Sequence, residues 1–443
     1  MPPPAVPHGM CLKVINNRSM KGGMGSETNP LRFMDQDFNV LQDYCLKTKQ
    51  RFVDEFFPPD PRSIVDHLTN TEGVLLFFFQ VLCPNAAELI VETVSRFDYA
   101  QGRVGNCWFL ASVGALTFQT KLLHKVIPDG QSFSHNYTGL FHFRFWRFGN
   151  WYDVVIDDKL PTIGRQLIFV KSKTFNEFWP ALVEKAYAKV CGSYADMHAG
   201  RVSEALLDFT GGVHMHYELK TAPTDLWEIM HRAYQIHLFY LFIYCRMSMN
   251  DFLRTFDNMD ICCICPDFLE GKSACHWISK YHHGSWISGS TDGGGINSFC
   301  KNPQFWLKVN EFDKACEQGQ NNVLVTLIQK PDKRHRRHSA HHGIGFYVFA
   351  IPPGMRSEGK LGSSFFLGRK PVVTSEPFQR ARQVMKFFRL EPGEYLIVPS
   401  TYQPKTKGEF ILSILCKNEI HIQTSRPIAK TYVLLLLPRA VRQ

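Results

Sequence analysis

The sequence has no apolar run long enough to cross a membrane. Its longest runs, residues 74–79 and 238–244, are far shorter than the roughly 20 residues that a spanning helix needs. No basic segment followed by an apolar one opens the chain, so we expect no secretory signal. Both absences favour a cytoplasmic protein without a transmembrane segment.

Cysteine is too sparse for a fold held together by disulfides. The chain has 13 cysteines among 443 residues, whereas small disulfide scaffolds carry them far more densely. The sequence also shows no internal repeat and no long low-complexity tract. With 44% apolar and 20% charged residues, the composition is that of a globular protein with room for two or three domains.

Acidic residues are fewer than basic ones, and the formal net charge is +10. The densest basic run consists of Lys333, Arg334, His335, Arg336, Arg337 and His338. A run of this kind is usually a solvated loop, and the alternative is a surface for acidic lipid or acidic protein. We expect no nucleic-acid partner.

The N-terminal part divides into an arm and a helical segment. Residues 1–35 are rich in Pro, Gly, Asn and Ser without periodicity, which predicts a loose arm. Residues 38–67 follow a helical pattern with one apolar stripe. The stripe contains Phe38, Leu41, Tyr44 and Cys45.

The next region, residues 86–234, mixes strand and helix patterns. The predicted strands are 141–148 and 151–156, joined by a turn at Gly149 and Asn150. The predicted helices are 107–116, 176–189 and 202–208.

After about residue 300, short β-rich runs separated by Gly, Pro and basic turns predict a β-sandwich. Examples of these runs are 323–329, 344–350, 394–399 and 409–415.

Residues 101–111 carry the clearest chemical signal. They read Gln-Gly-Arg-Val-Gly-Asn-Cys-Trp-Phe-Leu-Ala, so two glycines precede Cys107 at the start of an apolar helix. A thiol at a helix N-terminus feels the positive end of the macrodipole, which favours the thiolate. Gln101 can return its side-chain amide beside that thiol and donate to a developing oxyanion. The alternative is a buried structural cysteine, which the whole combination argues against.

This segment resembles the nucleophile motif of calpains, which are calcium-dependent cysteine endopeptidases with a papain-like core. Asn106 stands where that family usually has Asp. Residues 152–162, 177–189 and 207–212 resemble further segments of the first half of the calpain core. The resemblance implies that Cys107 is the nucleophile and Gln101 the oxyanion donor.

The C-terminal region resembles the calpain C2-like β-sandwich, also called domain III. The likeness is carried by residues 301–305, 327–330, 344–346 and 391–401. The loop that is strongly acidic in many calpains retains only Glu311, Asp313 and Glu317, which weakens any expectation that the sandwich binds calcium.

The chain departs from the family in the second half of the core. A cysteine peptidase needs a base beside its thiol and a group that orients the base. Calpains supply these in a Gly-His-Ala and an Asn-Pro-Trp segment, and neither string occurs here. His342 and Asn302 belong to sandwich motifs. His214 and His216 follow a Thr-Gly-Gly motif and are not expected to replace the base.

The loss is centred on residues 236–245, an apolar stretch without a counterpart in the family. Alternative splicing and an imperfect gene model both explain it. The stretch has the composition of an aggregation-prone segment. We expect it either to promote association or to fold back as a surrogate strand.

Calcium ligands are implied by the resemblance alone. Asp98 and Glu177 match the family's first calcium site, with backbone carbonyls near Val91 and Thr93 completing it. The alternative for each carboxylate is a surface charge or a helix cap. Because the unfamiliar segment 75–84 precedes Asp98, we expect weak binding. No EF-hand loop follows residue 419.

The predicted fold class is α+β, the first half of a papain-like core followed by a C2-like β-sandwich. The predicted parts are an arm (1–35), the half-core (36–235), a junction (236–266), the sandwich (267–418) and a divergent tail (419–443).

The resemblance implies limited intracellular proteolysis of protein substrates under calcium control, and the missing base predicts that this chain is inactive. The alternative is a non-catalytic protein that docks acidic lipid or protein. The residues for that docking are Lys333, Arg334, Arg336 and Arg337.

Overall fold

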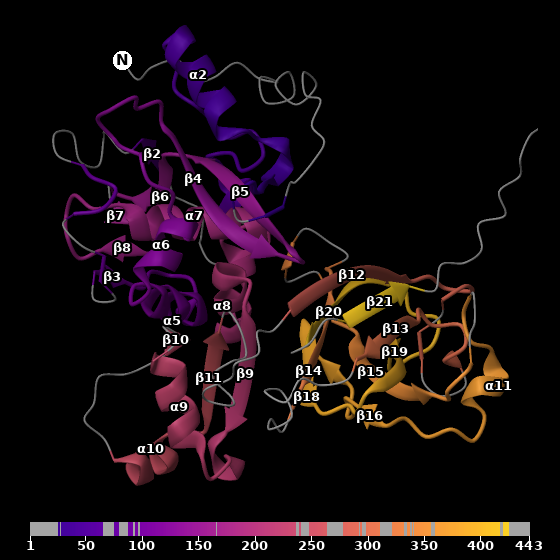
Figure 1. The fold of residues 1–443 in the computed structure, drawn as a ribbon. Helices are drawn as coiled ribbons and strands as arrows, with labels where there is room; N and C mark the ends of the chain where they lie inside the picture. Colours follow the sequence, from indigo (N-terminus) through magenta and orange to yellow (C-terminus); the bar gives the residue numbers. More distant parts are fainter. Residues whose placement is uncertain are drawn as a thin grey trace, which may run out of the picture. The chain divides into compact units, whose positions relative to one another are not determined.

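The computed structural model forms two compact units (Figure 1). The first contains Met1–Lys272 and Pro331–Ala340, and the second contains Ser273–Lys330 and His341–Gln443. No helix in the described part of the chain is long and apolar enough to cross a membrane.

The structure describes residues 25–26, 28–64, 75–78, 87–91, 94–95, 98–164, 166–235, 239–240, 248–263, 278–291, 293–294, 298–310, 321–331, 335–336, 339, 341–355, 359–416 and 420–424.

The first unit is organised around the hairpin of β4 (Leu140–Arg147) and β5 (Asn150–Asp157). Arg147 pairs with Asn150, so the turn residues are Phe148 and Gly149, one position earlier than predicted. Both have positive φ, 47° and 85°, as a two-residue hairpin turn requires.

The predicted loose arm contributes one short strand. In β1 (Leu31–Arg32) the chain runs parallel to β5, with Leu31 opposite Tyr152. This part of the arm is therefore ordered by the hairpin, while residues 1–24 lie outside the described residues.

Three smaller sheets complete the first unit. The strand β2 (Leu75–Phe78) falls in the segment 75–84, which is unfamiliar in calpains, and pairs antiparallel with β6 (Lys159–Ile163). The three sheets are β2 (Leu75–Phe78), β6 (Lys159–Ile163) and β7 (Gln166–Leu167); β3 (Tyr99–Ala100) and β8 (Lys171–Ser172); and β10 (Phe239–Tyr240), β11 (Asn258–Cys263) and β9 (Val213–Glu218).

The apolar junction folds back over two residues. Phe239 pairs with Cys262 and Tyr240 with Ile261, which makes β10 an edge strand beside β11. This favours the surrogate-strand alternative for these two residues. The remainder of 236–245 lies outside the described residues.

The helices agree with the predictions in the core and differ near the N-terminus. The pattern over 38–67 predicts one helix, but the described residues of this range form two, because α2 ends at Thr48, where Lys49 takes the left-handed conformation, and α3 begins only at Pro61. Leu41 and Cys45 of the predicted stripe are buried. The helices are α2 (Phe38–Thr48), α3 (Pro61–Ile64), α5 (Cys107–Leu116), α6 (Thr120–Val126), α7 (Trp179–Cys191), α8 (Val202–Thr210), α9 (Leu226–Gln235) and α10 (Met249–Thr255).

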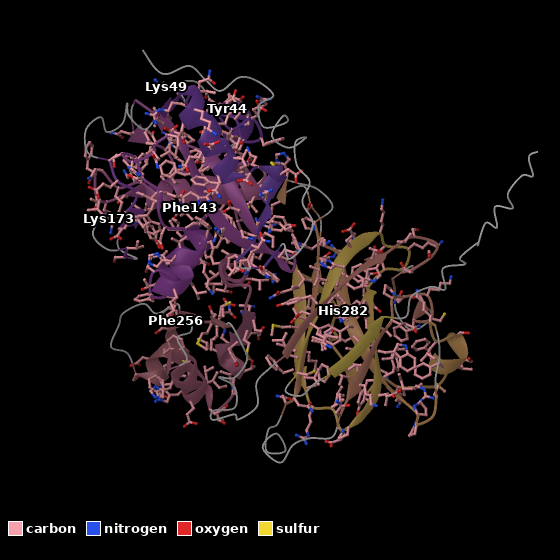
Figure 2. The ribbon with its side chains drawn as sticks, turned by 45° about the horizontal axis from the view of Figure 1, so that its top comes forward. Tyr44, Lys49, Phe143, Lys173, Phe256 and His282 are labelled. Carbon is pink, nitrogen blue, oxygen red and sulfur yellow. The ribbon has the colours of Figure 1, made fainter. Side chains whose placement is uncertain are left out.

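Helix α7 lies at the centre of the first unit. All of its residues are buried, including Glu184, Lys185 and Lys189. It packs against β4 and β5, whose inward side chains such as Phe143 lie within the dense core seen in Figure 2. Because charges are costly to bury, each of the three needs a partner inside the core.

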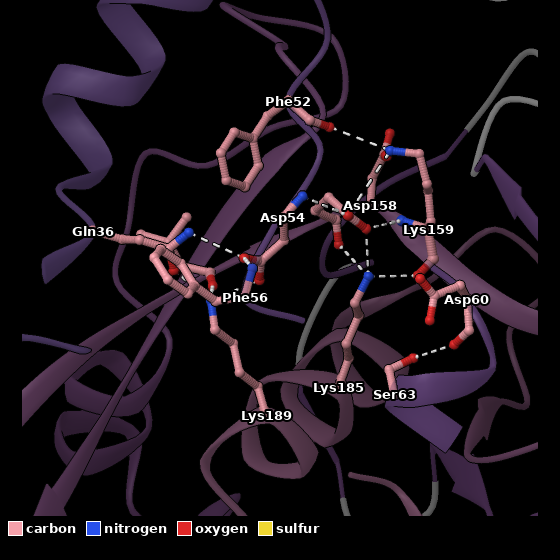
Figure 3. A network of polar contacts seen from close by, with 12 residues as sticks. Gln36, Phe52, Asp54, Phe56, Asp60, Ser63, Asp158, Lys159, Lys185 and Lys189 are labelled. Carbon is pink, nitrogen blue, oxygen red and sulfur yellow. Dashed lines mark hydrogen bonds and ion pairs between the residues drawn. The ribbon is translucent and has the colours of Figure 1, made fainter. Parts of the chain in front are cut away.

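Lys189 joins α7 to the N-terminal segment (Figure 3). Its ammonium group lies 2.6 Å from Asp54 Oδ2, donates to the Val155 carbonyl oxygen at 2.6 Å, and also donates to Gln36 Oε1. Gln36 in turn donates to Asp54 Oδ1 at 3.0 Å. All three donor positions of the ammonium group are therefore used.

Lys185 joins α7 to the end of β5. Its ammonium group donates to a carboxylate oxygen of Asp157 and to the Lys159 carbonyl oxygen at 2.6 Å. Burial alone would raise the pKa of Asp157, but Lys185 and Lys159 outweigh it, and the pKa is lowered. The carboxylate stays ionised and holds the strand on the helix.

The second unit consists of two antiparallel sheets with a shared apolar core. Residues from both sheets, such as Val325 and Val348, belong to one buried cluster. The sheet orders are β12-β20-β14-β18 and β16-β15-β19-β13-β21, with β17 paired to β15. This confirms a β-rich second unit, and the C2-like label stays a prediction.

All four β-rich runs that the sequence analysis singles out are strands; one matches its predicted bounds, and the other three are extended by one or two residues at each end. They are β14 (Val323–Gln329), β15 (Gly343–Ile351), β19 (Gly393–Thr401) and β20 (Gly408–Cys416). The other elements of the unit are β12 (Ile278–Trp286), β13 (Phe305–Val309), α11 (Ser363–Phe366), β16 (Val373–Thr374), β17 (Gln379–Arg380), β18 (Gln383–Phe388) and β21 (Ile420–Thr424), which lies within the predicted tail.

We predict that Lys189→Met lowers the free energy of unfolding by about 3–5 kcal/mol, because it leaves Asp54 buried without its cation. Urea unfolding followed by circular dichroism measures the change. Lys47→Met, which removes an exposed ion pair with Asp43, is the control and should change stability by less than about 1 kcal/mol. Equal effects of the two substitutions would refute the role of the buried pair.

Candidate active site

Cys107 is the first residue of α5, as the sequence predicts. Its side chain is exposed and its thiol is free. The carbonyl oxygen of Asn106 accepts hydrogen bonds from the amides of Phe109 and Leu110, which starts the helix at the thiol. The thiol therefore lies at the positive end of the helix dipole.

The two glycines before Cys107 are required by close packing. A Cβ on Gly102 would lie 2.3 Å from backbone atoms of Phe169, and the neighbouring Arg103 amide donates to the Ile168 carbonyl oxygen at 2.8 Å. A Cβ on Gly105 would lie 2.7 Å from Nδ1 of His198. Neither glycine is among the residues with positive φ, so close contact with neighbouring segments, and not a special backbone conformation, accounts for the glycine at each position.

Gln101 lies in the same turn. Its side-chain amide donates to the Val104 carbonyl oxygen at 2.9 Å, and the residue is exposed. To reach an oxyanion at Cys107, the amide must exchange this hydrogen bond for a new one. Its role as oxyanion donor stays a prediction.

The side chain of Asn106 is hydrogen-bonded to α7. Its Nδ2 donates to Oε1 of Glu184 at 2.6 Å, and the other carboxyl oxygen accepts from the Val170 amide at 2.9 Å. Burial raises the pKa of Glu184 to about 8, against the lowering effect of these hydrogen bonds. Sequence patterns alone did not identify Glu184 as a functional residue. A glutamate among the apolar residues of the helix predicted over 176–189 could have indicated it.

Trp108 connects Cys107 to the loop at 192–200. Its indole nitrogen donates to the Met197 carbonyl oxygen at 2.9 Å, and a Cβ on Gly200 would lie 2.3 Å from its ring. The Ala199 amide donates to the Gly105 carbonyl oxygen at 3.1 Å. The loop thus contacts the chain on both sides of Cys107.

The two histidines that follow the Thr-Gly-Gly motif both contact one aspartate. His214 Nε2 and His216 Nδ1 lie 2.6 and 3.0 Å from one oxygen of Asp260. His198, which contacts Gly105, was not recognised from the sequence, and only its neighbourhood in the fold reveals it.

The two sandwich residues serve the second unit. The His342 amide donates to Gln329 Oε1 at 3.0 Å, and Asn302 Nδ2 donates to the Gly294 carbonyl oxygen at 3.1 Å and to Ser400 Oγ at 2.9 Å. Both have structural partners there, as expected of residues from sandwich motifs.

Asp98 and Glu177, the residues implied as calcium ligands, both contact Ser172, Asp98 through its backbone carbonyl oxygen. The Ser172 hydroxyl lies 3.0 Å from the Asp98 carbonyl oxygen and 2.8 Å from Glu177 Oε2, while the Val91 amide donates to Glu177 Oε1 at 2.9 Å. Burial is the main cause that raises the pKa of Glu177, and the charge of Asp98 adds to it.

A cation between these carboxylates would relieve their repulsion, and their oxygen donors suit calcium. However, no group of three or more His, Cys, Asp or Glu in the described residues is arranged to hold a metal ion. Backbone carbonyls would have to supply the other ligands. Thr93 lies outside the described residues.

The basic run is only partly described. Lys333, Arg334 and Arg337 lie outside the described residues. Arg336 is engaged within the first unit, where its guanidinium pairs with Glu204 at 2.9 Å. The run therefore contains at least one residue with a defined intramolecular partner.

The matches to known families follow the two units. The model of the calpain family cysteine protease matches residues 52–245, and that of the calpain large subunit, domain III, matches residues 282–415. The calpain-1 catalytic subunit of Sus scrofa is 34% identical, with 94% of this chain and 71% of the relative covered. The chain belongs to the calpain family.

Two further calpains show similar values. The human calpain-1 catalytic subunit is 33% identical, with 91% of this chain and 70% of the relative covered, and rat calpain-8 is 32% identical, with 92% and 71% covered. The Sus scrofa alignment runs over 512 residues, more than the 443 of this chain, so part of that calpain has no counterpart here.

We predict that Glu184→Gln flattens the pH dependence of stability in this calpain. Because the folded-state pKa of Glu184 is raised to about 8, the folded state binds the proton more tightly than the unfolded state. Its stabilisation is complete below the ordinary pKa of 4.5 and is lost as the pH rises toward 8.

The expected slope is at most about 1.4 kcal/mol per pH unit. Urea unfolding at several pH values between 5 and 8 measures it, and Glu218→Gln at an exposed position is the control. An unchanged slope in Glu184→Gln would contradict the prediction.

Proposed function

We propose that this chain carries the nucleophile half of a calpain-type cysteine endopeptidase and is catalytically inactive as it stands. The observation that supports this most is the contrast between a well-positioned Cys107 and the missing Gly-His-Ala and Asn-Pro-Trp segments. For a complete core, the resemblance implies limited proteolysis of cytoplasmic protein substrates under calcium control.

The chemistry explains why half a site is insufficient. The thiolate of Cys107 would attack a peptide carbonyl carbon, and donors near Gln101 would stabilise the oxyanion. The leaving amine then needs a proton, which an imidazole beside the thiol normally supplies. Without that imidazole the tetrahedral adduct returns to substrate.

We expect no measurable cleavage of a fluorogenic peptide at any calcium concentration. Losing the base of a catalytic triad costs about 10⁶-fold in serine enzymes, which corresponds to roughly 8 kcal/mol. Cys107→Ser is the matched control and should equal the parent chain.

Calcium-dependent turnover that Cys107→Ser abolishes would disprove the proposed inactivity. His198→Ala would then test whether the imidazole beside Gly105 has taken the role of the base.

Calcium binding is proposed at Asp98 and Glu177. The ion would offset the repulsion between the two carboxylates and hold together the segments that meet there. Glu88 and Glu177 already form an isolated parallel bridge, and the Phe178 amide donates to the Glu88 carbonyl oxygen at 3.1 Å. With two carboxylates and no third side-chain ligand among the described residues, the site should be weak.

We predict calorimetric binding weaker than micromolar, abolished by Glu177→Gln and unchanged by Glu88→Gln. Glu88→Gln is the control, because Glu88 is exposed, forms the backbone bridge with Glu177 and is not one of the proposed ligands. Micromolar affinity lost only in Glu177→Gln would show a stronger site than proposed, and equal loss in both variants would place the ion elsewhere.

The second candidate is a non-catalytic protein that docks acidic lipid or protein through its basic run. The absent base favours it, because an inactive chain can still bind. Lys333, Arg334 and Arg337 would supply the positive charge. Arg336, paired with Glu204, would first have to leave its partner.

A further inference from the structure

The segment Pro331–Ala340 separates β14 from β15 in the sequence, yet its contacts place it in the first unit. Two of its described residues, His335 and Arg336, contact the loop and helix that follow α7. The catalytic chemistry outlined above uses neither residue. Their contacts instead connect this segment to the neighbourhood of Cys107.

Arg336 contacts four residues in a small region. Nε and Nη2 donate to one oxygen of Glu204 on α8 at 3.2 and 2.9 Å. Nη1 donates to the Ala199 carbonyl oxygen at 2.7 Å and more weakly to that of Asp196 at 3.4 Å. The guanidinium also lies 5.0 Å from the ring centroid of Trp108, within cation–π range.

His335 strengthens the same loop from the other end. Its Nδ1 lies 2.7 Å from Oδ2 of Asp196, which also accepts from Ser193 Oγ at 2.5 Å. A Cβ on Gly192 would lie 2.7 Å from the His335 ring, so the two segments are in direct contact.

Two of the residues that Arg336 contacts, Ala199 and Trp108, connect it to the neighbours of Cys107. Ala199, whose carbonyl oxygen binds Arg336, donates its amide to Gly105 at 3.1 Å. Trp108, under the guanidinium, directly follows Cys107. Burial opposes the charge of Arg336, but Glu204 and other nearby groups outweigh it and raise the pKa of Arg336, so the ion pair persists across the physiological range.

We infer that Arg336 is a positioning residue for Cys107, because it fastens the loop at 192–200 and the ring of Trp108 onto the first turn of α5. The planar fork of arginine suits this role, since it bonds a carboxylate and a carbonyl at once and stacks on an aromatic ring. The inference rests on the proposed nucleophile role of Cys107, but it concerns positioning before any catalytic step.

The test uses the full chain with Arg336→Ala and Arg336→Lys. Arg147→Ala is the matched control, because Arg147 also pairs with α8, at 3.2 Å from Asp208, and lies 5.2 Å from the Phe148 ring centroid. Peptide-resolved hydrogen exchange reports on residues 192–201 and 102–109. Alkylation of Cys107 by iodoacetamide at one fixed pH, relative to Cys300 in the same molecule, reports on the thiol.

We expect Arg336→Ala to speed exchange in both segments by about tenfold, the effect of losing one charge-assisted hydrogen bond. Relative alkylation of Cys107 should fall about two- to fivefold, the size of a helix-terminus effect on charge. Arg336→Lys should lie between Arg336→Ala and the parent chain, and Arg147→Ala should change neither quantity.

Unchanged alkylation in Arg336→Ala would overturn the inference, even if exchange is faster. The same changes in Arg147→Ala would also overturn it, because they would indicate general loosening of the unit. Neither measurement depends on turnover, so peptidase activity in the parent chain would contradict the proposed inactivity while leaving this result intact.

Discussion

The first unit depends on the burial of two lysines on α7. Lys185 and Lys189 enter the core where ammonium groups are costly, and each is compensated by an aspartate and by carbonyl oxygens (Figure 3). These partners come from three places in the chain: Gln36 lies before α2, Asp54 lies after it, and residues 155–159 lie where β5 leads into β6. One helix thereby fixes the positions of elements more than 100 residues apart in sequence.

The same helix supports the candidate site. Glu184, directly before Lys185 in α7, accepts a hydrogen bond from Asn106, and Glu177 lies just before the helix begins. Helix α7 therefore contacts the residue before Cys107 and begins beside Glu177, one of the implied calcium ligands. A substitution in α7 is therefore expected to displace both Asn106 and Glu177, because close-packed interiors transmit small displacements.

Cys107 is thus surrounded by neighbouring residues that have packing or hydrogen-bond contacts of their own. Gly102 contacts the segment at Phe169, Gly105 contacts His198, and Trp108 contacts Met197 and Arg336. None of these contacts involves a Gly-His-Ala or Asn-Pro-Trp segment, neither of which occurs in the sequence.

The sequence by itself determined the family, the helix that begins at Cys107 and the strands of the second unit, because short motifs and local periodicity encode them. It also showed that no Gly-His-Ala or Asn-Pro-Trp segment is present. Only the tertiary structure decided why Gly102 and Gly105 are glycines, that Glu184 lies behind Asn106, and that Arg336 binds Glu204 and Ala199. These contacts join residues 65 or more positions apart, and no local pattern records which distant side chain will be buried beside another.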